Sequence, residues 1–243
     1  MEFINQFKLI EAIMSGSMPD AKKFLAEVDR DAVERSLKRS KEGFPKHFIF
    51  IDEPIEEANF ARIPSRDKEK ILRIYDRIKS NPVKSKKALP MLLEFREKYP
   101  NVPIIYNHIG LIYVQTDQLD LYFENLLETN RLFPDYLFAK TAMCDHYLNE
   151  GDVKKVDKVL EGKFEIYMHF PPSEKVFHVS AVRAFYSVVG SYFARRNKIA
   201  RAIYCYFILE GAGSDHPVTE KVRNEIMARE IKNMGGKLSK NIR

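Results

Sequence analysis

PIIYNHIGLIYVQTDQLDLYFENLLETNRLFP, residues 103–134, is the segment of this 243-residue chain with the clearest structural pattern. Tyr106, Gly110 and Tyr113 are four and three residues apart, so a bulky, a small and an aromatic side chain share one helical face. The polar run that follows predicts a turn, and Pro134 predicts the end of a second helix. The second helix carries five apolar residues: Leu119, Tyr122, Phe123, Leu126 and Leu127. The segment therefore predicts two antiparallel helices joined by a short turn.

The same arrangement returns at a period of 34 residues, which indicates a repeat architecture. Three pairs of equivalent residues show the period: Pro100 and Pro134, Gly110 and Cys144, Tyr113 and Tyr147. A later copy repeats the first-helix face as Tyr186-x3-Gly190-x2-Phe193. Several copies in phase are much stronger evidence than one, because a single copy of so degenerate a pattern arises easily by chance.

The earliest copy is clear mainly in its second helix, through Leu92 and Phe95. Its first helix is expected at residues 68–79, with Leu72 and Tyr75 turned inward. Asp76 stands where the other copies have Gly110, Cys144 and Gly190, so this copy departs from the pattern.

These copies resemble the tetratricopeptide repeat, with about four repeats within residues 69–216. Residues 103–136 are the best copy, followed by 183–216, and 137–170 and 69–102 are weaker. The resemblance implies an all-α fold, a right-handed superhelix of antiparallel helix pairs. It also implies a function in binding other proteins or peptides.

A stacked array needs covers at both ends, because each helix pair has more apolar surface than it buries alone. We therefore expect two regions: residues 1–65 as an N-terminal helical cap with an extended segment, and residues 66–243 as the repeat domain. A C-terminal capping helix is expected at 218–234, from Val222, Ile226 and Ile231. The apolar residues of the predicted N-terminal cap are Phe3, Phe7, Ile10, Met14, Phe24, Leu25, Val28, Val33 and Leu37.

Two segments, 46–52 and 164–170, do not follow a helical pattern. They fit either a small ribbon, in which they pair, or an extended strap and a helix end, and we favour the second interpretation. Twelve extra residues separate the third copy from the fourth. After them, Ser173 and Glu174 are expected to cap a long helix that runs towards Arg196.

Tetratricopeptide arrays typically bind peptides in a concave groove lined by the first helix of each pair. Carried over to the equivalent positions here, the resemblance implies nine candidate ligand-binding residues: Arg73, Arg77, Asn107, His108, Thr141, Asp145, Ser187, Ser191 and Arg195. Some members of the family clamp a terminal carboxylate with basic residues from consecutive repeats. Phe138 and Ala142 stand where the third copy would need such residues, so a groove that accepts an apolar anchor is the better expectation.

The sequence gives no support for catalysis. The six histidines fall into no metal-binding spacing, and no glycine-rich phosphate loop or Gly-x-Ser-x-Gly motif is present. Cys144 occupies the small-residue position between paired helices, where a thiol usually only packs. We therefore expect no catalytic residue, no metal ligand and no cofactor.

The compartment is expected to be a reducing cytoplasm. The charged residues Glu2, Lys8 and Glu11 interrupt the apolar residues at the N-terminus, which argues against a secretory signal. No stretch reaches the roughly 18 consecutive apolar residues of a membrane span, so no membrane partner is expected. Two distant cysteines, Cys144 and Cys205, form no disulfide framework.

The net charge of +6 is unevenly distributed, and residues 66–99 carry 11 basic and 5 acidic side chains. Nucleic-acid binding is the alternative function, because two basic clusters are present. One is the lysines at 84, 86 and 87, and the second is Arg195-Arg196-Asn197-Lys198 with Arg201. The acidic segment 100–170 opposes a continuous track for phosphates, so the sequence disfavours this alternative. The expected function is a protein-interaction scaffold or adaptor, and self-association is a further alternative.

Overall fold

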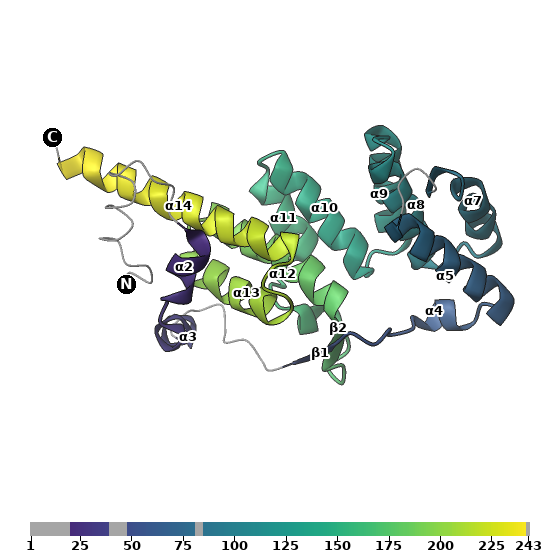
Figure 1. Cartoon of the computed structure of the whole chain (residues 1–243), viewed down its shortest axis with the longest axis horizontal. Helices are drawn as coiled ribbons and strands as arrows, with labels where there is room; N and C mark the ends of the chain where they lie inside the picture. The colour runs from purple at the N-terminus through teal and green to yellow at the C-terminus, as the bar shows by residue number, and fades with distance from the viewer. Residues whose placement is uncertain (1–19, 39–47, 81–84, 242–243) are drawn as a thin grey trace. The chain divides into compact units, whose positions relative to one another are not determined.

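The computed structural model describes residues 20–38, 48–80 and 85–241, and these residues are mostly helical, as the sequence predicts (Figure 1). The chain divides into two compact units. Residues 53–143 form one unit, and the segments before and after them form the other. None of the helices in the described ranges combines the length and the apolar character that crossing a bilayer requires.

The turn between paired helices has the same backbone geometry three times. Asp117, Gly151 and Asn197 each adopt a positive φ, of 56°, 78° and 58°. The residue after each of them donates its backbone N–H to the carbonyl five residues earlier, on Tyr113, Tyr147 and Phe193, at 2.8–2.9 Å. This pattern is the Schellman motif, which satisfies the last carbonyls of a helix and turns the chain sharply. The first two turns are 34 residues apart, so the sequence period is also a period of backbone conformation.

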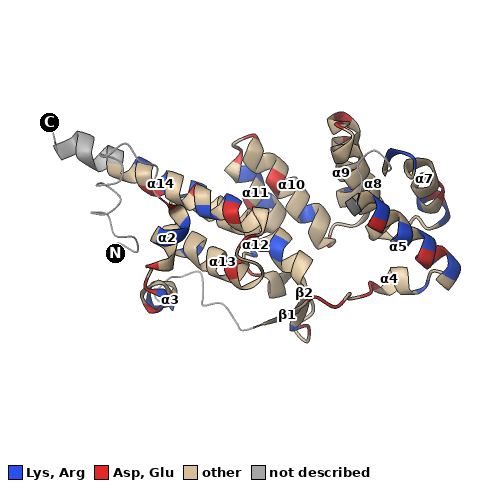
Figure 2. Cartoon of the chain, in the orientation of Figure 1, with Lys and Arg blue, Asp and Glu red and all other residues tan. Residues whose placement is uncertain are grey.

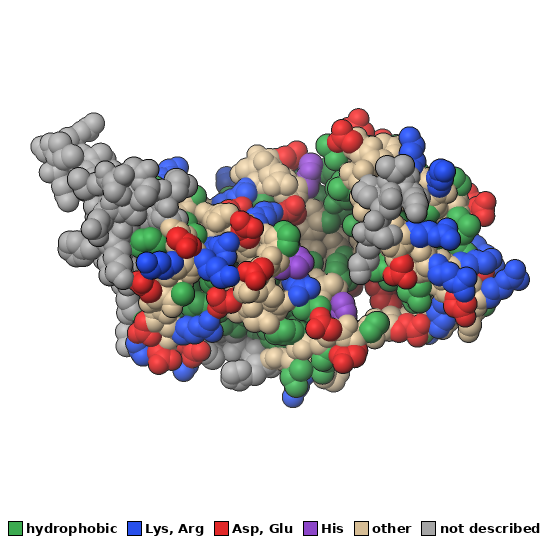
Figure 3. All heavy atoms as spheres, in the orientation of Figure 1, with side chains coloured by type: hydrophobic (Ala, Val, Ile, Leu, Met, Phe, Trp, Pro, Cys, Tyr) green, Lys and Arg blue, Asp and Glu red, His purple; other side chains and the backbone are tan. Residues whose placement is uncertain are grey.

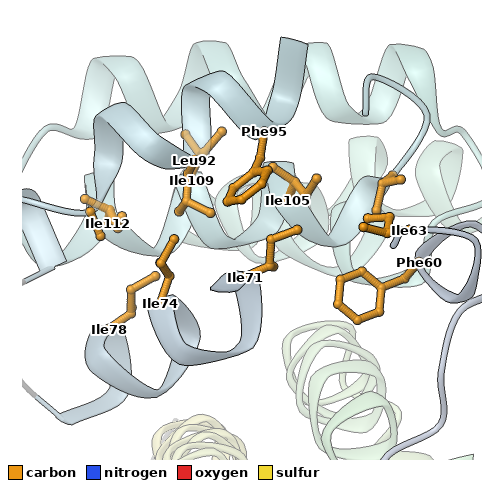
Figure 4. Close-up of a cluster of buried hydrophobic side chains, with 12 residues drawn as sticks. Phe60, Ile63, Ile71, Ile74, Ile78, Leu92, Phe95, Ile105, Ile109 and Ile112 are labelled. Atoms are coloured by element: carbon orange, nitrogen blue, oxygen red, sulfur yellow. The ribbon is translucent and has the colours of Figure 1, made fainter. Parts of the chain in front are cut away.

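The unit of residues 53–143 is built from helices around one apolar core. Its elements are α4 (Ala58–Ala61), α5 (Ser65–Ser80), α7 (Leu89–Lys98), α8 (Pro103–Gln115), α9 (Leu119–Leu132) and the start of α10 (Leu137–Asn149). Helix α8 packs against α5, α7 and α9. Figure 4 shows the side chains that meet between α5, α7 and α8, and six of them are fully buried: Ile71, Ile78, Leu92, Ile105, Ile109 and Ile112.

In the first copy of the pattern, the face of α5 that enters the core differs from the predicted face. Ile71, Ile74 and Ile78 are the residues of α5 that enter the core, whereas Leu72 is 46% exposed. The inward orientation predicted for Leu72 is therefore wrong. Three isoleucines at spacings of three and four form a larger apolar row than Leu72 with Tyr75, and burial of the larger row is favoured.

The core of this unit is closed by residues just before α5. Phe60, from α4, and Ile63 are buried in the same cluster as the α5 isoleucines (Figure 4). Asn59 donates a 2.9 Å hydrogen bond to the carbonyl of Asn101, and Lys68 forms an ion pair of 2.9 Å with Glu56. These contacts hold α4 and the residues beside it against the core formed by α5, α7 and α8.

Helix α12 (Val179–Arg195) lies at the centre of the other unit. It packs against α13 (Ile199–Gly211), against α14 (Pro217–Asn241) and against the 3-10 helix η1 (Ile166–His169). Consequently α12 buries residues on all sides, from Val179 to Ala194. Helix α11 (Val153–Leu160) begins at Asp152, whose carboxylate accepts the N–H of Lys155 at 3.1 Å.

Both predicted capping regions occur as helices in this second unit. Val222 and Ile226 are fully buried on α14, and Ile231 is half-buried. Helices α2 (Ala21–Ala26) and α3 (Arg30–Lys38), with the turn between them, bury the five apolar residues expected there: Phe24, Leu25, Val28, Val33 and Leu37. However, α2 packs on α14 and α3 packs on α13. The units thus differ from the predicted division at residue 65. The predicted stripe of Phe3, Phe7, Ile10 and Met14 lies outside the described residues.

A two-stranded parallel ribbon joins segments that are far apart in the sequence. Strand β1 (Ile49–Ile51) pairs with β2 (Val176–His178), with Phe50 opposite Phe177. The extended strap that we favoured for 46–52 is therefore wrong at Ile49–Ile51, and the ribbon that we considered had the wrong partner, since residues 166–169 form η1. The partner strand comes from the stretch of extra residues before α12.

Helix α12 also starts later than predicted. Its N-cap is His178, whose Nδ1 accepts the backbone N–H of Ser180 at 3.2 Å, so Ser173 and Glu174 do not cap it. The pairing of β2 with β1 holds residues 176–178 in an extended conformation, which excludes them from the helix.

Candidate interaction surface

Four of the nine predicted ligand-binding residues are buried. His108 is 2% exposed, and Ser191 is completely inaccessible to solvent. Thr141 and Ser187 are also buried, and their hydroxyls donate to carbonyls three residues earlier, on Phe138 and Ala184, at 3.1 Å. These four side chains are packed inside the protein, so they are not accessible to a ligand.

Helix α12, which carries both serines, packs against α14. A Cβ atom on Gly190, the residue before Ser191, would lie 2.8 Å from Cγ1 of Val222 on α14. Helix α14 therefore covers part of α12, and the buried Ser187 and Ser191 do not line an open groove.

Two further predicted residues are bound to neighbouring side chains. Asp145 forms an ion pair with Lys221 on α14. Arg195 holds both carboxylate oxygens of Glu225, at 3.2 and 3.0 Å, and also donates to the carbonyl of Leu148. A bidentate arginine–carboxylate pair is among the strongest polar contacts, so Arg195 primarily fastens α14 to α12.

His108 stacks on Tyr75, with ring centroids 4.5 Å apart and ring planes 12° from parallel. Burial lowers the pKa of His108 from its usual 6.5 to about 4, because the charged ring would be desolvated. Its Nδ1 atom has no hydrogen-bond partner in the described part of the chain. His108 is therefore a neutral aromatic residue of α8 that packs against α5.

This histidine makes the unit of residues 53–143 acid-labile. Between the usual pKa of 6.5 and the folded pKa of about 4, the unfolded chain binds a proton that the folded chain does not bind. Stability from this residue is therefore complete above pH 6.5 and falls as the pH falls. We expect a loss of about 2 kcal/mol in the free energy of unfolding from pH 7 to pH 5.

Urea unfolding at a series of pH values measures this loss, and His108→Phe is the comparison, since it keeps a stacked ring and cannot titrate. The variant is expected to lose less stability than the wild type over the same interval. An identical pH dependence in both proteins would show that His108 is not the acid-sensitive group.

The remaining predicted residues, Arg73, Arg77 and Asn107, are exposed or half-buried. Arg73 and Arg77 belong to a longer row on α5 that also contains Arg66 and Lys70, and all four are exposed. Spacings of four, three and four residues return to the same side of a helix, so these four cations form one stripe. We call Arg66, Lys70, Arg73 and Arg77 the α5 basic stripe. Figure 2 shows the Lys and Arg residues along α5, and in Figure 3 such side chains gather on the surface over this helix.

The ion pairs of Lys70 and Arg73 are local to α5. Arg73 contacts Glu69 one turn earlier at 3.0 Å, with the two side chains 71% and 63% exposed, and Lys70 lies 4.0 Å from Asp67. Such exposed pairs contribute little to stability, because both side chains remain solvated. The Asp67 carboxylate instead binds Lys98 at 2.7 Å and Tyr99 at 2.6 Å, and these hydrogen bonds lower its pKa. The ion pairs of Lys70 and Arg73 consequently contribute little to holding α5 in place.

The second basic cluster of the sequence behaves differently. Arg195 pairs with Glu225, as above, and Arg196 lies 3.6 Å from Asp157. Arg201 is buried and lies 3.9 Å from the carboxylate of Glu165. Arg195 and Arg196 thus face carboxylates of their own unit, and the buried Arg201 is not accessible to a phosphate, so little of the positive track that the sequence suggested is available. Of the lysine cluster, Lys86 and Lys87 are exposed, and residue 84 lies outside the described residues.

An open pocket of about 230 Å³ lies between the end of α12 and the middle of α14. Its cations include Arg195 and Arg229, and Arg229 donates to the carbonyls of Ala194 and Arg195 at 3.0 and 2.7 Å. Arg229 already donates to the last carbonyls of α12, and Arg195 already pairs with Glu225. The pocket therefore offers a ligand less positive charge than its composition suggests. Across the described ranges, no group of three His, Cys, Asp or Glu side chains is placed to hold a metal ion.

Comparison of the chain with protein-family models, with curated proteins and with solved structures gives no match.

Proposed function

We propose that this chain is a non-catalytic protein-interaction scaffold, built as a tetratricopeptide-like helical array, that binds a partner protein through the exposed face of α5. The observation that carries the proposal is the α5 basic stripe. It is exposed along three helical turns, and the core is on another side of α5, at Ile71, Ile74 and Ile78. Charge concentrated on an exposed surface is typical of a binding site.

Three sets of observations support the protein-binding proposal over the nucleic-acid alternative. In the cluster at residues 195–201, Arg195 and Arg196 are paired with carboxylates and Arg201 is buried. Two of the three turn motifs are 34 residues apart, the period of the tetratricopeptide repeat that the sequence resembles. Acidic side chains also lie next to the α5 basic stripe, at Glu69 and Asp76, where a phosphate backbone would be repelled.

Site-specific photo-crosslinking tests the proposal. A photo-reactive p-benzoylphenylalanine replaces Arg77 in the full chain, and the matched control replaces Lys158, an exposed residue of α11. In lysate of the native source, Arg77 is expected to give a protein adduct that Lys158 does not give. Excess unlabelled chain should abolish the adduct. Arg73→Glu/Arg77→Glu should compete about tenfold less well, because each reversed charge replaces attraction by repulsion.

The comparison for the competitor is Lys154→Glu/Lys158→Glu, which also reverses two exposed lysines one turn apart, on α11. We call this variant the α11 control, and it should compete like the wild type. Identical adducts at Arg77 and Lys158, equal competition by both double variants, or an adduct that nuclease treatment removes would each refute the proposed function.

A further inference from the structure

We infer that the partner segment bound by the α5 basic stripe is a helix with a row of acidic residues, which lies alongside α5 with its carboxylates against Arg66, Lys70, Arg73 and Arg77. This inference rests on the proposed function and names the class of its partner.

The spacing of the four cations favours a helical partner. Along α5 they are separated by four, three and four residues, which corresponds to about 6, 4.5 and 6 Å at the rise of an α-helix. A second helix with carboxylates at the same spacings matches this series along its whole length. An extended peptide presents side chains on one face at a constant interval of about 6.7 Å, so it falls out of step within the stripe.

The residues beside the stripe favour a protein over a polyanion. Glu69 and Asp76 are exposed, seven residues apart, and lie on the same side of the stripe. A phosphate backbone spreads negative charge over both rows and would be repelled by the second one, whereas a helix can carry acidic residues on one row and basic residues on the next.

Leu72 adds an apolar contact to the same exposed half of α5. It lies beyond Glu69 and Asp76 as seen from the stripe and is 46% exposed. The surface therefore consists of a positive row, a negative row and one apolar side chain. The complementary helix has an acidic row, a basic row next to it, and an apolar residue opposite Leu72.

Synthetic helical peptides provide the probe. The acidic peptide carries Glu at positions i, i+4, i+7 and i+11, Lys on the adjacent row and one Leu, and a second peptide has Gln in place of every Glu. Binding to the full chain is measured by fluorescence anisotropy at low salt. The acidic peptide should bind at least about tenfold more tightly than the Gln peptide, and Arg73→Glu/Arg77→Glu should weaken it by a similar factor. The α11 control should bind like the wild type, and Leu72→Ser should weaken binding by a smaller factor.

A charge swap tests the pairing directly. The variant with all four stripe residues changed to Glu should reject the acidic peptide and bind a peptide with Lys at the four positions. Circular dichroism of each variant verifies that the helices are retained. If this variant does not fold, Arg73→Glu/Arg77→Glu replaces it, with a peptide that carries Lys at only the two matching positions. This pair should then bind, and the acidic peptide should be rejected.

Each contrary outcome is distinct. Failure of the acidic peptide to bind, or equal binding of the acidic and Gln peptides, would refute the inference. Tighter binding of a duplex oligonucleotide or of phosphatidylserine vesicles through the stripe would replace the helix by a phosphate ligand and refute it as well. A specific adduct at Arg77 together with a failed peptide would overturn the partner class alone, and absence of the adduct would overturn the proposed function.

Discussion

Gly190→Leu is expected to destabilise the unit that contains α12 by about 3 kcal/mol or more, because an overpacked core forces side chains and backbone to shift. Even a Cβ atom at this position would lie 2.8 Å from Cγ1 of Val222 and 3.1 Å from Cβ of Cys205. Both neighbours are buried, on α14 and α13, so neither helix moves away without losing its own contacts. Urea unfolding followed by circular dichroism measures the loss.

Two comparisons make the result specific to this helix contact. Gly211→Ala, at the end of α13, should change stability by less than about 0.5 kcal/mol, since the nearest atom to its Cβ would be 3.9 Å away. Combining Gly190→Ala with Val222→Ala should cost less than the sum of the two single changes, because the second removes the clashing methyl groups. Additive costs would show that Gly190 and Val222 do not meet.

The sequence predicted the helix pairs well because their signals are local. The bulky–small–aromatic face of each first helix depends only on spacing within one helix, and Tyr186 and Phe193 are buried as that spacing implies. Turns are equally local: Gly151 tolerates a positive φ, and Asp152 after it begins the next helix. Of the second-helix residues, Leu126 is buried, but Leu119 and Leu127 are 58% and 45% exposed.

The phase of α5 was mispredicted for an identifiable reason. Alignment on the 34-residue period places Asp76 in the small-residue position and turns Leu72 inward. Counting apolar residues along the helix itself would have given the row of Ile71, Ile74 and Ile78. Where a repeat departs from the family pattern, the helix's own periodicity is thus the better guide to its buried face.

The candidate site was harder to predict, because accessibility depends on contacts between distant segments. Ser187 and Ser191 have suitable side chains for a groove, but the sequence does not reveal that α14 packs on the helix that carries them. The ribbon of Ile49–Ile51 with Val176–His178 is equally non-local. In contrast, Arg66 and Lys70 were missed although their spacing to Arg73 was visible in the sequence. The resemblance to the repeat family points only to positions that line its groove, and Arg66 and Lys70 are not among them.

A buried polar cluster gives the second large expected effect. Glu165 is 5% exposed, its Oε2 atom accepts a 2.9 Å hydrogen bond from the Tyr186 hydroxyl, and its Oε1 atom lies 3.9 Å from Arg201. Burial raises the pKa of Glu165 to about 7, although the hydrogen bond and the nearby guanidinium oppose that shift. The folded chain therefore keeps a proton on Glu165 under conditions in which the unfolded chain has released it.

We expect Glu165→Gln to be more stable than the wild type by up to about 3 kcal/mol at pH 8 and equally stable near pH 4.5. As the pH rises from 4.5 to 7, the unfolded chain gains stability by ionising Glu165 while the folded chain does not, so the wild type loses stability over this range. Glutamine resembles the protonated acid and still accepts the Tyr186 hydrogen bond, so the variant avoids this loss. Urea unfolding at several pH values between 4.5 and 8 measures the difference.

Arg201 decides how this result is interpreted. A buried pair often contributes little because desolvation offsets the attraction between the charges, and removal of one partner leaves the other charge uncompensated. Arg201→Met should therefore destabilise the chain more at pH 8, where Glu165 is largely ionised, than at pH 5. If Glu165→Gln were instead less stable than the wild type at pH 8, the attraction to Arg201 would exceed the cost of burying the carboxylate, and Glu165 would be ionised at neutral pH. Comparison of the two variants across the same pH range thus measures which of the two energies is larger inside this helical unit.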